Sequence, residues 1–177
     1  MSLPRSGRLN EVYPSRRDAQ GNPLCRYCGA PLSGRRTSWC GEDCVREAKI
    51  RLWPSAARYY VWERDHGVCA LCGFDAGLLE RVNRHLEHAT DNEYGSDLQS
   101  YMALREARVV LARVAGATMG LWSRFPHLWE ADHIVPVAEG GGQCGLENYR
   151  TACLRCHRAE TRRLRQRLAG KRMEERA

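Results

Sequence analysis

The 177-residue sequence has no long apolar run and almost no lysine. No stretch approaches the ~20 consecutive apolar residues that a membrane-spanning helix needs, and the N-terminus has no apolar core of the kind found in signal peptides. These absences argue against a membrane partner and favour an intracellular protein. Lysine contributes 2 of the 28 basic residues and arginine the other 26. Arginine side chains suit phosphate geometry, but a GC-rich genome produces the same bias.

Cysteine, in contrast, is abundant, and eight of the nine cysteines fall into four close pairs. The pairs are Cys25/Cys28, Cys40/Cys44, Cys69/Cys72 and Cys153/Cys156. Such short spacings suit tetrahedral zinc better than disulfides. Zinc thiolates also imply a reducing compartment, which we expect to be the cytoplasm or nucleoid, or the nucleus of a eukaryote. Cys144 is left over, and we expect it to be a small buried residue.

The first two pairs predict a zinc-binding subdomain over residues 21–52. Its ligands would be Cys25, Cys28, Cys40 and Cys44. Cys25 and Cys28 flank a tight turn whose backbone N–H groups can face thiolates, and the second pair leads into a helix over 45–52. About 30 residues lack the core to fold without a metal, which favours a structural zinc. Residues 1–20 are polar and are predicted to form a flexible arm.

Residues 53–168 are predicted to form a second domain that carries a helical insertion at 77–126. A helix is expected at 55–65, with Ser55 as its N-cap. Its aromatic residues, Tyr59, Tyr60 and Trp62, fit a core better than a surface that stacks on bases. Gly67 should end that helix.

The insertion is predicted to contain helices at 77–89 and 97–115. The second helix has an apolar face, and Arg108 is expected to lie outside it. His85 and His88 have the spacing to share a metal ion, but a solvated helix face is the favoured interpretation.

Residues 128–161 combine two short strands, a glycine loop and the fourth cysteine pair. A strand over 128–135 should end at Pro136, Gly140–Gly142 should reverse the chain with positive φ, and 149–153 should form the return strand. A helix continues from Thr161. At the junction between strand and helix, Cys153 and Cys156 can complete a second zinc site. Its other ligands would be Cys69 and Cys72.

Four polar side chains in this stretch have the chemistry for phosphodiester hydrolysis. Asp132 offers a hard oxygen ligand, and together with His157 it could hold a weakly bound divalent cation. His133 is suited to accepting a proton from water. Neighbours in a regular strand point to opposite faces, so the strand end must be distorted if Asp132 and His133 serve one phosphate. Asn148 can hold the loop or reach the metal.

The positive charge of +7 is concentrated at the C-terminal end. Residues 150–177 contain ten Lys/Arg and three Asp/Glu, so the first 149 residues are neutral. This segment, with a basic tail at 169–177, suits a phosphate backbone, whereas a solvated charged helix is the simpler alternative. The candidate contacts are Arg158, Arg162, Arg163 and Arg165.

These residues together resemble the motif of the HNH endonucleases, which have a ββα-metal fold. The matching residues are Asp132-His133-Ile134-Val135-Pro136, Gly140-Gly141-Gly142, Asn148 and Cys153-Leu154-Arg155-Cys156-His157. The resemblance implies an α+β fold with a ββα-metal nuclease core. This core would carry the four-cysteine zinc, the helical insertion and the N-terminal zinc-finger-like subdomain predicted above. It implies that His133 is the general base and that Asp132 and His157 bind one Mg²⁺ or Mn²⁺. Asn148 would be the central asparagine of the motif.

A closer likeness extends over residues 21–163. It is to the C-terminal HNH module of annealing helicases that carry a Ran-binding zinc finger. This likeness implies a DNA endonuclease that acts on duplex or branched substrates in repair. The sequence contains no Gly-x4-Gly-Lys-Ser/Thr nucleotide loop, so a helicase or other ATP-driven partner is expected to act in trans or from a longer parent protein. Two alternatives stay open: a non-catalytic, zinc-stabilised DNA-binding module, and a restriction-type nuclease for modified DNA.

Overall fold

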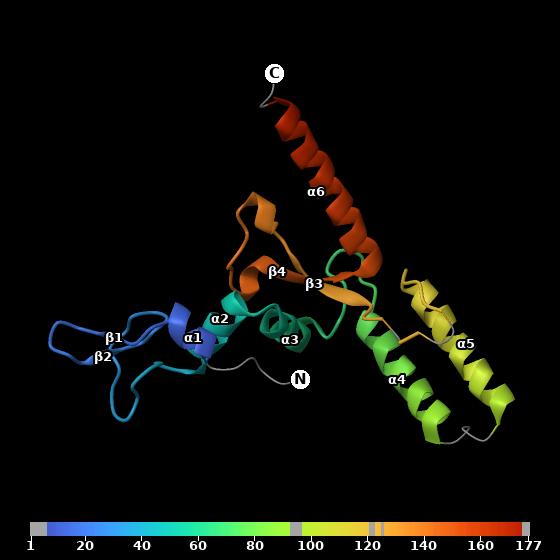
Figure 1. The fold of residues 1–177 in the computed structure, drawn as a ribbon, viewed down its shortest axis with the longest axis horizontal. Helices are drawn as coiled ribbons and strands as arrows, with labels where there is room; N and C mark the ends of the chain where they lie inside the picture. The colour runs from blue at the N-terminus through green and yellow to red at the C-terminus, as the bar shows by residue number, and fades with distance from the viewer. Residues whose placement is uncertain (1–6, 93–96, 121–122, 125, 175–177) are drawn as a thin grey trace. The chain divides into compact units, whose positions relative to one another are not determined.

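The computed structural model describes residues 7–92, 97–120, 123–124 and 126–174 (Figure 1). It is a mixed helix and strand structure, as predicted. In chain order the elements are α1 (Gly7–Val12), β1 (Arg16–Arg17), β2 (Pro23–Leu24), α2 (Glu42–Leu52), α3 (Pro54–Asp65), α4 (Ala76–Asn92), α5 (Leu98–Val114), β3 (Trp129–His133), η1 (Val137–Glu139), η2 (Leu146–Asn148), β4 (Tyr149–Cys153) and α6 (Leu154–Glu174). None of the helices in these ranges is long and apolar enough to cross a membrane.

The chain forms two compact units. The first unit holds the described residues of Met1–Val61 together with His133–Tyr149, and the second holds those of Trp62–Asp132 together with Arg150–Ala177. The loop that joins β3 to β4 therefore groups with the N-terminal part of the chain. The domain boundaries at 20, 52 and 168 stay predictions.

In the first unit, residues 7–20 contain regular structure where a flexible arm was expected. α1 packs beside α2, and β1 pairs antiparallel with β2 in the register Arg16↔Leu24 and Arg17↔Pro23. This pairing could not be predicted from the sequence, because a two-residue strand is too short to show an alternation of apolar and polar residues.

α2 and α3 supply most of the apolar core of the first unit. The buried apolar residues of these two helices are Ala48, Ile50, Ala56, Ala57 and Val61. α3 begins at Pro54 rather than after a Ser55 cap, so that prediction was wrong. Proline is favoured at the first helical position, because its fixed φ fits the helix and its missing N–H would have no partner there.

In the second unit, α4 and α5 lie side by side (Figure 1). Asp75 accepts a hydrogen bond from Leu78 N at 2.7 Å at the start of α4, and Asp97 caps α5 by accepting from Gln99 N and Ser100 N. These acidic caps satisfy backbone donors that the first helical turn leaves free. The two predicted helices of the insertion are present.

The packing between α4 and α5 corrects the predicted apolar face of α5. Arg108, expected outside that face, is 3% exposed. Its Nε donates to Asn83 Oδ1 at 2.8 Å and its Nη2 to Glu87 Oε1 at 3.0 Å. Val110 and Val114, whose apolar side chains the sequence assigned to this face, are exposed instead. A buried guanidinium with two partners satisfies its donors, which a count of apolar positions cannot detect.

The segment β3–β4–α6 follows the predicted ββα order, with β3 and β4 paired in one two-stranded sheet. β3 ends at His133, two residues before the expected end, and Ile134 is half exposed in the loop. α6 starts at Leu154, so it begins directly after β4 rather than at Thr161. Trp62 and Trp129 stack with ring centroids 5.7 Å apart and support β3. Tyr59, expected in the core, is exposed.

Candidate active site and metal centres

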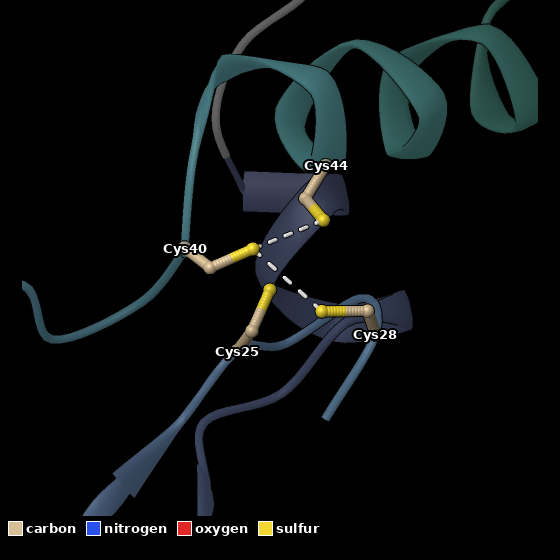
Figure 2. Close-up of side chains that lie close together, drawn as sticks. All are labelled: Cys25, Cys28, Cys40 and Cys44. Carbon is tan, nitrogen blue, oxygen red and sulfur yellow. Dashed lines mark hydrogen bonds between the residues drawn. The ribbon is translucent and has the colours of Figure 1, made fainter. Parts of the chain in front are cut away.

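The first cysteine cluster lies in the first unit, where its four sulfur atoms point toward one centre (Figure 2). The ligands come from the turn after β2 and from the start of α2: Cys25, Cys28, Cys40 and Cys44. The sulfurs of Cys40 and Cys44 lie 3.3 Å apart and those of Cys28 and Cys40 lie 3.6 Å apart. Zn–S bonds of about 2.3 Å place tetrahedral sulfurs about 3.8 Å apart, so these spacings suit a zinc ion.

Backbone N–H groups stabilise the thiolate of Cys25, as the predicted turn requires. Burial raises the pKa of Cys25, but hydrogen bonds from the backbone of Cys28, Cys40 and Tyr27 outweigh it and lower the pKa to about 6. Burial and the neighbouring cysteines raise the pKa of Cys44. The Cys25 thiol is thus the one that loses its proton most readily, and a bound cation would keep the other three thiols deprotonated.

The second cluster lies in the second unit and joins residues far apart in the sequence. Its members are Cys69, Cys72, Cys153 and Cys156, and their sulfurs all lie within 4.8 Å of one another. Cys72 and Cys153 approach to 3.8 Å. Ala70 N donates to Thr151 O at 2.9 Å, so the turn that carries Cys69 is attached to β4. The cysteine pairing predicted from spacing is therefore the one that the fold brings together.

Cys144, the ninth cysteine, belongs to neither of these clusters. It is half-buried in the loop before β4, rather than fully buried as expected. His85 and His88 are both exposed on α4, which agrees with a solvated helix face.

Asn148 holds the loop between β3 and β4 with its whole side-chain amide. Its Oδ1 accepts from Val135 N at 2.8 Å, and its Nδ2 donates to Val135 O and Gly141 O, both at 3.0 Å. A Cβ added at Gly141 would lie 1.7 Å from Val135 O, so glycine is required there. Of the two roles considered for Asn148, the geometry favours holding the loop.

We expect Asn148→Ala to lower the free energy of unfolding by about 2–3 kcal/mol, because three hydrogen bonds of about 1 kcal/mol each are lost. Urea denaturation followed by circular dichroism measures the change. Asn22→Ala is the matched control, since the Asn22 amide makes one exposed bond to Asp18. Equal stability of the two variants would contradict the role of Asn148.

His133 occupies the last position of β3, in the first unit. Its ring packs against Tyr149, with centroids 4.4 Å apart and planes inclined by 44°. Burial, followed by the neighbouring Cys144, raises the pKa of the Tyr149 hydroxyl, so this ring stays neutral at physiological pH. The neutral Tyr149 ring therefore restricts the rotation of the His133 imidazole without placing a charge beside it.

Asp132, His157 and Arg150 meet in the second unit. Asp132 Oδ1 lies 3.9 Å from Nε2 of His157, which is on the first turn of α6. Asp132 Oδ2 accepts from Arg150 Nε at 2.9 Å. Cis and trans ligands of an octahedral ion with bonds of about 2.1 Å are separated by about 3.0 and 4.2 Å. The observed 3.9 Å lies between these values, so Oδ1 and Nε2 are close enough to share one Mg²⁺ or Mn²⁺ after a small adjustment of the side chains.

The four arginines proposed to contact DNA differ in their surroundings on α6. Arg158 Nη1 donates to Gly116 O at 2.6 Å, and Arg163 Nη1 lies 2.5 Å from Glu160 Oε1. Arg162 and Arg165 are exposed and have no carboxylate within 4.0 Å among the residues described. The guanidinium of Arg158 therefore lies just beyond the C-terminal end of α5, where a cation is favourable. Arg162 and Arg165 are thus the stronger candidates of the four.

Sequence reasoning missed Arg150, Glu160 and Tyr149 as neighbours of the site. Arg150 bridges Asp132 and Glu160, with Nη2 at 3.3 Å from Glu160 Oε2. Tyr149 lies beside His133. The alternation of β4 and the three-residue spacing of His157 and Glu160 on a helix could have placed Arg150 and Glu160 near Asp132.

Comparison with known proteins gives consistent results. The family model of the HNH endonucleases matches residues 122–163. The human DNA annealing helicase and endonuclease ZRANB3 is 33% identical over 156 residues, which are 82% of this chain and 14% of the human protein. The Bos taurus protein of the same name is 33% identical over 154 residues, covering 81% of this chain and 14% of the relative.

A crystal structure of the human ZRANB3 HNH domain is 30% identical and covers 67% of this chain and 95% of that domain, with a TM-score of 0.40. The chain spans 14% of the length of the curated relatives. The chain therefore belongs to the HNH endonuclease family.

Proposed function

We propose that this chain is a metal-dependent endonuclease that hydrolyses phosphodiester bonds in DNA. The observation that carries the proposal is the pair formed by Asp132 Oδ1 and His157 Nε2, 3.9 Å apart within the segment that matches the family. The neighbouring four-cysteine cluster would be the structural metal site that holds the fold. The carboxylate and the imidazole are therefore better suited to binding a catalytic cation than a structural one.

Asp132 and His157 would hold one divalent cation, Mg²⁺ or Mn²⁺. When bound, this cation supplies positive charge that stabilises the phosphate oxygens and the leaving 3′-oxygen. Asp132 contributes a hard oxygen and His157 a neutral nitrogen, so the cation keeps positions for water and phosphate. Such a site binds weakly in the absence of substrate.

His133 would act as the general base. An imidazole nitrogen takes a proton from water, and the water oxygen attacks phosphorus in line with the leaving oxygen. The Tyr149 ring at 4.4 Å limits the orientations of His133. Asn148 would act indirectly, because its amide holds the loop that follows His133.

The DNA backbone would lie along α6. Residues 150–177 carry the whole excess positive charge of the chain, and Arg162 and Arg165 are exposed on this helix. Contacts of this kind position a duplex without reading its bases.

The relatives are named as both a DNA annealing helicase and an endonuclease, which supports DNA as the substrate. A preference for branched DNA and a role in DNA repair are further parts of the proposal. Any ATP-driven step would come from a helicase partner or a longer parent protein. We place the chain in a reducing compartment, because eight thiols in two zinc-type clusters need one.

A cleavage panel tests the proposal with single-stranded, duplex, forked and methylated DNA in Mg²⁺ and Mn²⁺. The zinc-loaded chain is expected to cut forked DNA fastest and to be inactive without a divalent cation. Cleavage of methylated DNA alone would favour a restriction-type nuclease. Binding without cleavage across the whole panel would favour the non-catalytic binding module.

A further inference from the structure

The two oxygens of the Asp132 carboxylate have different partners. Nε and Nη2 of Arg150 both lie 2.9 Å from Oδ2, whereas Oδ1 faces His157 Nε2 at 3.9 Å. Two donors on one oxygen leave it little capacity to bind a cation. Oδ1 is therefore the oxygen that is available to a metal.

Arg150 is fixed from a second side by α6. Its Nη2 lies 3.3 Å from Glu160 Oε2, and the other oxygen of Glu160 lies 2.5 Å from Arg163 Nη1. The side chains of Arg150 and Asp132 are only 18% and 15% exposed. His157 and Glu160 are three residues apart and share one helix face. Arg150 cannot leave Asp132 without also losing Glu160.

We propose that Arg150 determines which cation the site accepts, by restricting Asp132 to a single ligand oxygen. This inference rests on the proposed function and makes Arg150 a positioning residue. Ca²⁺ commonly takes about six to eight oxygens and often both oxygens of one carboxylate. Mg²⁺ keeps about six ligands in strict octahedral geometry and retains several waters. A carboxylate with one open oxygen therefore favours Mg²⁺ or Mn²⁺ over Ca²⁺.

The charge of Arg150 has a second consequence. A guanidinium beside the carboxylate repels a divalent cation, so it weakens the binding of the cation to the free protein. A phosphate bound at the same place would offset that repulsion. Removing Arg150 should thus tighten metal binding and at the same time slow cleavage, because Asp132 is no longer held in one orientation.

The test is Arg150→Gln in the zinc-loaded full chain, titrated without DNA. Two-dimensional NMR of the amides of Asp132 and His157 reports the Kd of Mg²⁺ and of Ca²⁺ separately. We expect the Kd of Ca²⁺ to fall on the order of tenfold relative to that of Mg²⁺. Arg150→Lys keeps the charge and one donor group, so it should give an intermediate ratio. A merely structural role for Arg150 would weaken the binding of both cations alike.

Arg81→Gln is the matched control, because Arg81 pairs with Asp75 outside the site, and it should keep the wild-type ratio. An unchanged ratio in a folded Arg150→Gln protein would overturn the inference, as would wild-type protein that binds neither cation at these residues. If Arg150→Gln fails to fold, a wild-type ratio in Arg150→Lys overturns it equally. A shifted ratio in a protein that cleaves no DNA would refute the proposed function and leave the role of Arg150 standing.

Discussion

Replacing His133 by alanine is expected to slow DNA cleavage by about 10²–10⁴-fold, the usual contribution of a general base. The substitution removes the imidazole that would accept the proton of the attacking water. DNA binding should change little, because the proposed phosphate contacts lie on α6 and not on β3. Single-turnover cleavage of a labelled duplex in saturating Mg²⁺ gives the rate, and a binding assay in Ca²⁺ gives the affinity.

His85→Ala is the control for this prediction, because His85 is exposed on α4 and should retain the wild-type rate. Metal-dependent cleavage by His133→Ala at the wild-type rate would remove His133 from the mechanism. An equal loss of rate and of DNA affinity would instead indicate that the ring contributes to binding.

Replacing Cys69 by serine should unfold most of the second unit. Cys69 is 2% exposed, and the turn that carries it is bonded to β4 through Ala70 N and Thr151 O. Structural zinc contributes folding energy directly, so losing one ligand of four removes both the metal and the link between segments 81 residues apart. Elemental analysis should give about two zinc ions per wild-type chain and about one in Cys69→Ser.

Cys144→Ser is the matched control, since Cys144 belongs to neither cluster of the described residues. It should keep both zinc ions and the wild-type melting temperature in circular dichroism. Fewer than about one zinc ion per wild-type chain would contradict both zinc assignments. A Cys69→Ser protein that melts at the wild-type temperature would show that the second cluster does not hold the fold.

The cysteine clusters and the ββα order could be predicted from the sequence because their signals are local. Zinc ligands occur in pairs two or three residues apart, and the two pairs of each site need only meet in space. The chain reversal at the glycine loop was predicted for the same reason, and Gly140 has the expected positive φ of 94°. Gly141 is required by its close approach to Val135 O instead, which only the structure reveals.

What the sequence could not reveal depends on tertiary packing. The burial of Arg108 follows from Asn83 and Glu87 on the neighbouring helix, which supply the partners that a buried guanidinium needs. The role of Arg150 was missed because the net charge of residues 150–177 does not reveal which carboxylate each arginine pairs with. Ile134 was assigned to a strand because it is apolar, but the loop held by Asn148 begins there.

The most direct test of this account is the nicking of plasmid DNA by the zinc-loaded chain as Mg²⁺ is titrated, in wild type and in Asp132→Ala. Asp132 lies outside both cysteine clusters, so the variant should keep its zinc and its fold. We predict nicking that rises to saturation with Mg²⁺ in the wild type and is abolished in Asp132→Ala. Nicking by the wild type without added divalent cation, or at the wild-type rate by Asp132→Ala, would contradict it.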